Sequence, residues 1–127
     1  MFADTSAFNS FAVDDLSAAR AFYGETLGLR TETIDGMPLL RLLPAGTGPT
    51  MVYEKPDFTP ATFTILNFAV DDVDAAVDAL TEAGVALERY DGFDQDEKGI
   101  ARGAGGGPDI AWFKDPAGNT LAVLQQT

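Results

Sequence analysis

Acidic side chains are the commonest groups in this chain that could do chemistry, and the usual catalytic partners for them are missing. The sequence has 20 Asp and Glu residues but no His and no Cys. It therefore offers no Ser-His-Asp set, no thiolate nucleophile and no imidazole metal ligand. Glu54, at the end of the strand-like run TMVYE, could act as a general base, but the sequence gives it no obvious proton-transfer partner.

Three acidic motifs resemble metal sites. The pairs Asp14-Asp15 and Asp71-Asp72 each follow a strand-like run and precede a helical pattern. At such a junction, helix capping and interaction with the helix dipole explain a carboxylate better than metal binding does. The run Asp94–Glu97 lacks the ligand spacing of a calcium loop. It is predicted to be a solvated acidic loop or an acidic lid over a binding site.

A repeat organises the elements that carry these residues. The pentapeptide FAVDD begins at Phe11 and again at Phe68, 57 positions later. If one residue is dropped near the second helix end, the offset becomes 56, and Glu32 then matches Glu88. Because the similarity keeps its register through this deletion, the sequence predicts an internal duplication.

Each half is predicted to contain one strand, one helix and three further strands. Phe11 and Val13, like Phe68 and Val70, alternate with smaller or polar residues, and the apolar positions after each aspartate pair have helical spacing. The later strands are predicted at Leu29–Ile34, Pro38–Leu43, Thr50–Glu54, Val85–Tyr90, Ile110–Lys114 and Thr120–Gln125, with the DPAGN turn joining the last two as a hairpin. Residues 1–127 are expected to form a single domain, with module one at about 5–55, a linker at about 55–60 and module two at about 61–127.

Composition restricts the partners. The net charge of −12 disfavours nucleic acid and anionic membranes and attracts cationic small molecules, although the acidity could also serve solubility alone. No apolar run approaches the roughly 18 to 20 residues of a membrane span. Without a signal peptide pattern or cysteines, the expected location is cytoplasmic.

The repeat, together with FYGETLGL at the first helix end and FKDPAGNTLAVLQ near the chain end, resembles the vicinal oxygen chelate superfamily. This superfamily includes glyoxalase I, fosfomycin-resistance proteins, extradiol dioxygenases and bleomycin-resistance binding proteins, and the resemblance covers nearly the whole chain. It implies an α+β fold of two tandem βαβββ modules, whose mixed sheet curls into a cup with the helices outside. It also implies a homodimer, because small members commonly pair modules between chains.

The resemblance further implies where a metal would be held. Catalytic members bind a divalent metal in the cup through His or Glu side chains. Those places fall here on Phe8, Ile65 and Ala122, and module symmetry puts the remaining one on Val52. None of these side chains has a lone pair for a metal. We therefore expect no metal and no cofactor.

Strand alternation predicts the lining of the cup. If Phe11 and Phe68 face the helices, the alternate positions of the same two strands face the other way, into the cup. The predicted ligand-binding set is Phe8, Ser10, Val52, Glu54, Ile65, Asn67, Ala122 and Leu124. Trp112 joins it as a stacking surface, although parity alone does not decide between Trp112 and Phe113. The alternative is that Phe8, Ile65 and Leu124 simply fill the cup.

These features predict a metal-independent small-molecule binding protein, similar to the antibiotic-sequestering members of the superfamily. The expected ligand is apolar or aromatic and cationic, because Glu54 would place one carboxylate beside apolar walls. The alternative is a glyoxalase-type lyase or isomerase that uses Glu54 as its base. A protein–protein module is a third interpretation, which no feature of the sequence specifically favours.

Overall fold

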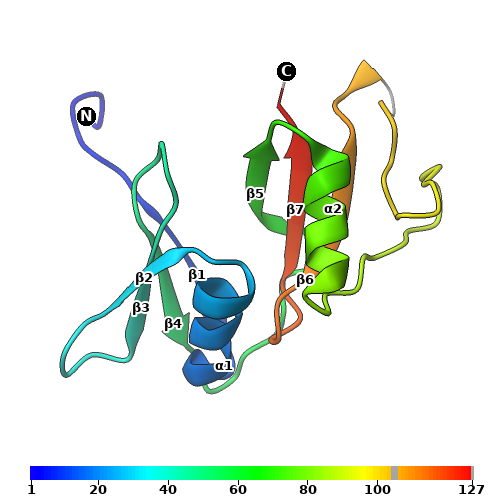
Figure 1. Ribbon diagram of the computed structural model, residues 1–127. Coiled ribbons are helices and arrows are strands. Elements are labelled where there is room, and N and C mark those ends of the chain that lie inside the picture. The colour runs from blue at the N-terminus through cyan, green and yellow to red at the C-terminus, as the bar shows by residue number, and fades with distance from the viewer. Residues whose placement is uncertain (104–105, 127) are drawn as a thin grey trace. The chain divides into compact units, whose positions relative to one another are not determined.

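The chain forms two compact units, Met1–Thr59 and Pro60–Thr127, in a computed structural model that describes residues 1–103 and 106–126 (Figure 1). Each unit contains one mixed β-sheet with helix packed against it. The predicted α+β class is therefore confirmed. Within the described ranges, no helix has the length and apolar character that crossing a membrane requires.

Unit 1 carries the first mixed sheet. Its elements are β1 (Asn9–Val13), α1 (Leu16–Arg20), η1 (Ala21–Thr26), β2 (Arg30–Thr33), β3 (Leu39–Leu43) and β4 (Thr50–Glu54). The strands lie in the order β1-β4-β3-β2. β1 and β4 are parallel, whereas the other neighbours are antiparallel. The first and last strands of the unit are therefore neighbours, as the βαβββ pattern requires.

The helix of unit 1 begins as the sequence predicts and then widens. The Asp15 carboxylate accepts the Ala18 N–H at 3.1 Å, which confirms the capping role of the aspartate pair. In η1 the helix is a π-helix that ends at Thr26, and Gly28 then turns the chain with a φ of 74°, which suits a residue without a side chain. The buried ring of Tyr23 packs on Phe11, with ring centroids 5.7 Å apart.

Unit 2 carries the second mixed sheet. Its elements are β5 (Thr64–Val70), α2 (Val73–Glu82), β6 (Ile110–Lys114) and β7 (Thr120–Gln125). The order is β5-β7-β6, with β5 parallel and β6 antiparallel to β7. The Asp72 carboxylate caps α2 by accepting the Ala75 N–H at 3.1 Å. The predicted hairpin between β6 and β7 is confirmed, and the Asp115 carboxylate accepts the Asn119 N–H at 2.8 Å within its turn.

The predicted strand Val85–Tyr90 is wrong as a full strand. Among the described residues this segment forms a single bridge, from Leu87 to Phe113, followed by one hydrogen bond from the Glu88 N–H to the Trp112 carbonyl at 2.8 Å. The pairing with β6 ends there. The next N–H that could donate to β6, that of Tyr90, donates to the Gln95 side chain at 2.9 Å instead. A local side-chain acceptor thus replaces the neighbouring strand.

The closing strand of each unit is tied to the start of the unit's helix in the same way. In unit 1 the Glu54 Oε2 accepts the Leu16 N–H at 3.1 Å. In unit 2 the Gln125 Oε1 accepts the Val73 N–H at 2.9 Å. Both acceptors lie in register with the last residue of the opening strand. They satisfy backbone donors that a helix start otherwise leaves without a partner.

Candidate functional site

Each sheet has one face covered by its helix and an opposite face, which we call the open face. In unit 2 the covered face contains Phe113, which is buried and stacks on Phe68 with centroids 6.5 Å apart. Because neighbouring strand residues point to opposite faces, Trp112 lies on the open face. The structure therefore decides the ambiguous pair in favour of Trp112.

An aromatic pocket of about 290 Å³ lies around Trp112 on unit 2. Its lining residues are Thr62, Phe63, Thr64, Tyr90, Phe93, Trp112 and Thr120. The Tyr90 ring meets the indole edge-on at 5.5 Å between centroids, and the Phe93 ring is tilted against it at 4.9 Å. Aromatic faces with a few threonine hydroxyls favour the stacking of a planar ligand and its orientation by hydrogen bonds.

The other predicted site residues of unit 2 lie near this pocket in the sheet. Asn67 and Ala122 occupy the same register row as Trp112 and therefore share its face. Leu124 lies on that face too, two residues along β7. None of the three lines the aromatic pocket. Ile65 lies where the register of β5 shifts, and the pocket is lined by Thr64 instead.

The predicted inward face of β4 in unit 1 is wrong by one residue. Val52 is fully buried and in register with Phe11, so it lies on the covered face. Glu54 lies on that face as well, where its carboxylate binds the start of α1. The open face of β4 instead carries Met51 and Tyr53. Module symmetry does not fix the face of a β4 residue, because the segments between strands differ in length in the two units.

The remaining candidates of unit 1 are exposed. Phe8 precedes β1 and its exposed fraction is 69%. Ser10 is exposed and pairs in register with Met51 on the open face. Farther along the same row, Arg41 donates to Glu32 at 3.0 Å, and its buried Nε has no acceptor within the described residues. This guanidinium is therefore only partly satisfied by the protein.

The donor set on these faces does not fit the divalent metal that the sequence resemblance implies. Phe8, Ile65 and Ala122 have no ligating atom, and Met51, which takes the place expected for Val52, has only a soft thioether. In the part of the chain that the structure describes, no group of three or more His, Cys, Asp or Glu side chains is arranged to hold a metal ion.

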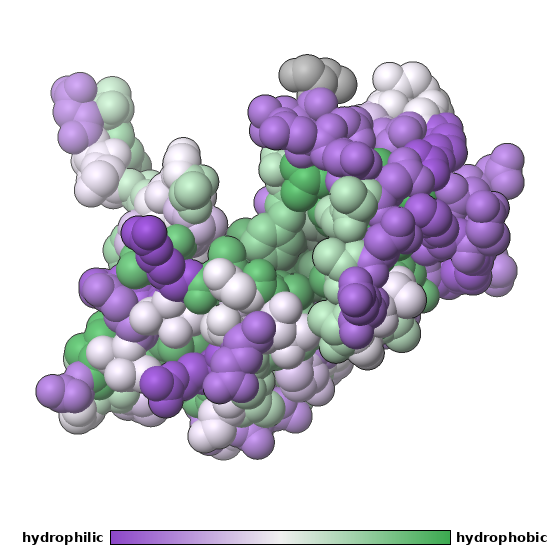
Figure 2. Space-filling view, viewed as in Figure 1, coloured by the Kyte–Doolittle hydropathy of each residue, from purple (hydrophilic) through white to green (hydrophobic). Residues whose placement is uncertain are grey.

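In the acidic run Asp94–Glu97, the Asp96 carboxylate is directed toward α2 and not toward the aromatic pocket. Asp96 binds Arg102 at 2.9 Å, and Arg102 in turn holds Asp74 of α2 through two hydrogen bonds of 2.7 and 2.9 Å. The hydrogen bond from Arg102 lowers the pKa of Asp74 from 3.8 to about 2. Figure 2 shows hydrophilic side chains gathered over α2 and the chain beside it.

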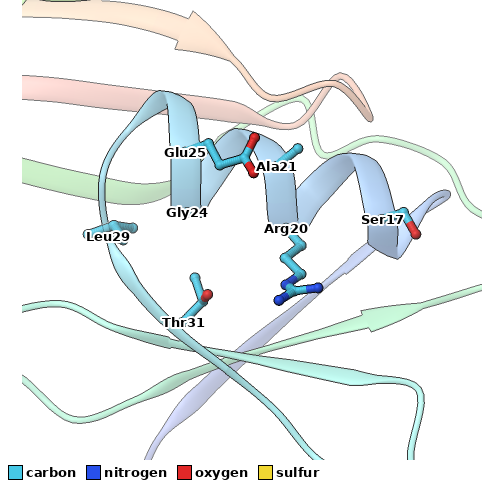
Figure 3. A pocket seen from close by; sticks show the side chains of 7 residues that line it. All are labelled: Ser17, Arg20, Ala21, Gly24, Glu25, Leu29 and Thr31. Atoms are coloured by element: carbon cyan, nitrogen blue, oxygen red, sulfur yellow. The ribbon is translucent and has the colours of Figure 1, made fainter.

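Two pockets among the described residues of unit 1 lack an aromatic wall. One, of about 390 Å³, lies beside the helix and is lined by Arg20 of the helix and Thr31 of β2 (Figure 3). The other, of about 520 Å³, lies at the sheet edge and includes Arg41 and Asp35. Since neither offers a stacking surface, the aromatic pocket of unit 2 is the stronger candidate for an organic ligand.

Sequence and structure comparisons agree on one group of proteins. Residues 7–123 match the family model described as "Glyoxalase/Bleomycin resistance protein/Dioxygenase superfamily". No protein with a curated description matches the chain. Among solved structures, TnmS3, an antibiotic binding protein from Streptomyces sp. CB03234, is 27% identical with a TM-score of 0.69, over 98% of both chains.

Two more solved structures show the same fold. A glyoxalase/bleomycin resistance protein from Streptomyces sp. CB03234 is 28% identical with a TM-score of 0.65, covering 95% of this chain and 100% of its own. Lactoylglutathione lyase from Agrobacterium tumefaciens is 21% identical with a TM-score of 0.66, covering 95% and 93%. At that lower identity the likeness concerns the fold alone.

Proposed function

Because this chain belongs to the Glyoxalase/Bleomycin resistance protein/Dioxygenase superfamily, we propose that it is a small-molecule binding protein whose ligand stacks in the aromatic pocket of unit 2. The observation that carries the proposal is the packing of Tyr90 and Phe93 around the exposed side of Trp112. The likeness to an antibiotic binding protein over 98% of both chains supports it.

The proposed ligand is aromatic and carries a positive charge. Aromatic faces attract cations by about 0.5 to 2 kcal/mol, depending on desolvation. The chain's net charge of −12 raises the local concentration of cations near the surface. Glu54 no longer contributes to this argument, since its carboxylate binds the helix start. The preference for a cation therefore rests on the aromatic walls and on the overall field.

Asn67, Ala122 and Leu124 extend the proposed surface on the open face of unit 2. Ser10 and Phe8 are exposed in unit 1 and are proposed as accessible ligand contacts of that unit alone. Val52 leaves it, because a fully buried residue on the covered face has no access to a ligand. A glyoxalase-type reaction is the less favoured alternative, since its candidate base, Glu54, is engaged by a backbone N–H.

Metal independence, a homodimer and a cytoplasmic location complete the proposal. Metal independence follows from the donor set described above. The homodimer is supported by large exposed apolar side chains, among them Phe2, Phe8 and Phe63 with exposed fractions of 74%, 69% and 69%. The cytoplasmic location remains a prediction from composition.

A matched pair of dyes tests the binding proposal. N-methylacridinium is permanently cationic, whereas acridine has nearly the same shape and is neutral at pH 8. Both should bind and quench Trp112, the only tryptophan in the chain, with the cation about 2- to 30-fold tighter. Trp112→Ala should weaken both dyes at least tenfold, and Trp112→Phe should retain part of the affinity. Because these variants lack the tryptophan, their binding and that of wild type are compared by the anisotropy of the dyes' own fluorescence. Glu97→Gln, outside the pocket, serves as the surface control. Equal binding by wild type and Trp112→Ala would show that the pocket is not the site.

A further inference from the structure

The segment after α2, residues 88–102, supplies two walls of the aromatic pocket, and we call it the aromatic loop. Tyr90 and Phe93 belong to it, and both rings contact Trp112. Phe93 keeps 48% of its surface exposed, so side-chain packing alone does little to fix its position. The path of the loop backbone must therefore hold these two rings in place.

Gln95 organises the inside of the aromatic loop. Its amide oxygen accepts the Tyr90 N–H at 2.9 Å. Its amide nitrogen donates to the Glu88 carbonyl at 2.9 Å and to the Gly99 carbonyl at 2.7 Å. One half-buried side chain thus joins three points of the loop, two of which lie on either side of the pocket-lining Tyr90.

Asp96 fastens the other side of the loop to α2. One of its carboxylate oxygens accepts the N–H groups of Lys98 and Ile100, both at 2.9 Å. The other binds Arg102, whose guanidinium forms the paired hydrogen bonds with Asp74 in the first turn of α2. Ile100 is fully buried, so this end of the loop is anchored by packing as well. Asp96 and Gln95 themselves do not line the pocket.

We propose that Gln95 and the Asp96–Arg102–Asp74 ion-pair cluster are positioning residues, which set the affinity of the aromatic pocket by holding Tyr90 and Phe93 against Trp112. The inference rests on the proposed binding role of that pocket. In this proposal the Asp96 carboxylate orders the loop by binding Arg102 on the α2 side of unit 2, and it does not contact the ligand.

The test combines a ligand-free readout with a binding readout. Gln95→Leu removes all three side-chain hydrogen bonds and approximately keeps the volume. We expect acrylamide quenching of Trp112 to rise about twofold and the Kd for N-methylacridinium and for acridine to rise about tenfold. Asp94→Asn is the matched control, because the Asp94 side chain forms no hydrogen bond or ion pair within residues 1–103 and 106–126, and it should change neither readout.

A second variant keeps the test decisive if Gln95→Leu does not fold. Asp96→Asn retains an oxygen for the Lys98 and Ile100 N–H groups but weakens the bond to Arg102, and we expect a smaller change in the same direction. Unchanged Trp112 quenching and unchanged Kd in a folded variant would overturn the positioning role. If wild type binds neither dye, the proposed function fails, whereas a rise in Trp112 quenching in the variants would still establish that Gln95 and Asp96 hold the rings.

Discussion

Replacing Glu54 with Gln distinguishes a helix-binding carboxylate from a ligand-binding one. In the structure the Glu54 Oε2 accepts the Leu16 N–H at 3.1 Å. Gln125 makes the corresponding bond to the Val73 N–H at 2.9 Å with an amide oxygen. Because Gln serves in one unit where Glu serves in the other, Glu54→Gln should keep the hydrogen bond and lose only the attraction between the carboxylate and the helix dipole.

The magnitudes follow from that geometry. An exposed charge at a helix start contributes about 0.3–1 kcal/mol, so Glu54→Gln should lower the free energy of unfolding by about 0.5 kcal/mol. Glu54→Ala also removes the acceptor, and losing a capping bond costs about 0.5–2 kcal/mol, so we expect a total near 1.5 kcal/mol. For a domain of this size the melting temperature should fall by about 2 °C and about 5 °C respectively.

Thermal unfolding followed by circular dichroism measures the stabilities, and titration with N-methylacridinium and acridine measures binding. Both variants should bind both dyes within twofold of wild type. Gln125→Ala is the positive control for stability, since it removes the corresponding acceptor in unit 2. The reasoning is refuted if Glu54→Gln leaves the melting temperature unchanged and weakens the cationic dye more than the neutral one. That result would place the carboxylate at the ligand and not at the helix.

Three further predictions concern the ion-pair cluster, metal content and assembly. Arg102 lowers the pKa of Asp74 from 3.8 to about 2 in the folded protein, so the charge stabilises the fold above about pH 4 and this contribution is lost as the pH falls toward 2. Asp74→Asn should therefore melt below wild type at pH 7, with a gap that closes by pH 2; a gap that widens in acid contradicts this. Elemental analysis of the purified protein should find no stoichiometric transition metal, and about one Zn, Ni, Mn or Fe per chain would overturn the donor-set argument. Light scattering at micromolar concentration should give twice the 13.4 kDa chain mass, and a monomer mass would count against the proposed dimer.

The strands that the sequence predicts best are those bounded by strong turn signals. Thr50–Glu54, Ile110–Lys114 and Thr120–Gln125 match β4, β6 and β7 residue for residue, because each run begins within two residues of a Gly, Pro or Asn. Val85–Tyr90 failed for a reason that strand propensity does not contain. A glutamine five residues beyond its end captures the Tyr90 N–H, so the chain leaves the sheet after Glu88.

The site was harder to predict, because the face that a strand residue occupies depends on its partner strand. A shift of one residue exchanges the two faces of a strand, and this is the whole error at Val52 and Glu54. The same dependence left Trp112 and Phe113 undecided until the pairing of β6 with β7 was known. The sequence does indicate a role for Phe93. A single aromatic side chain within the acidic run DGFDQDE is unfavourable in water and therefore predicts a contact with another apolar group.

The two units have similar helix-to-sheet contacts and differ on their open faces, so we expect the open faces to determine ligand specificity. On the covered faces, Glu54 and Gln125 perform one task, so changes there affect stability before they affect ligand choice. On the open faces, the row through Met51 ends in the Arg41–Glu32 ion pair, whereas the row through Ala122 ends in Trp112. The helix-facing acceptors make corresponding bonds in both units, whereas the side chains of the two open faces differ. Ligand selectivity should therefore respond to exchanges among open-face residues with little change in melting temperature, and helix-face exchanges should show the reverse.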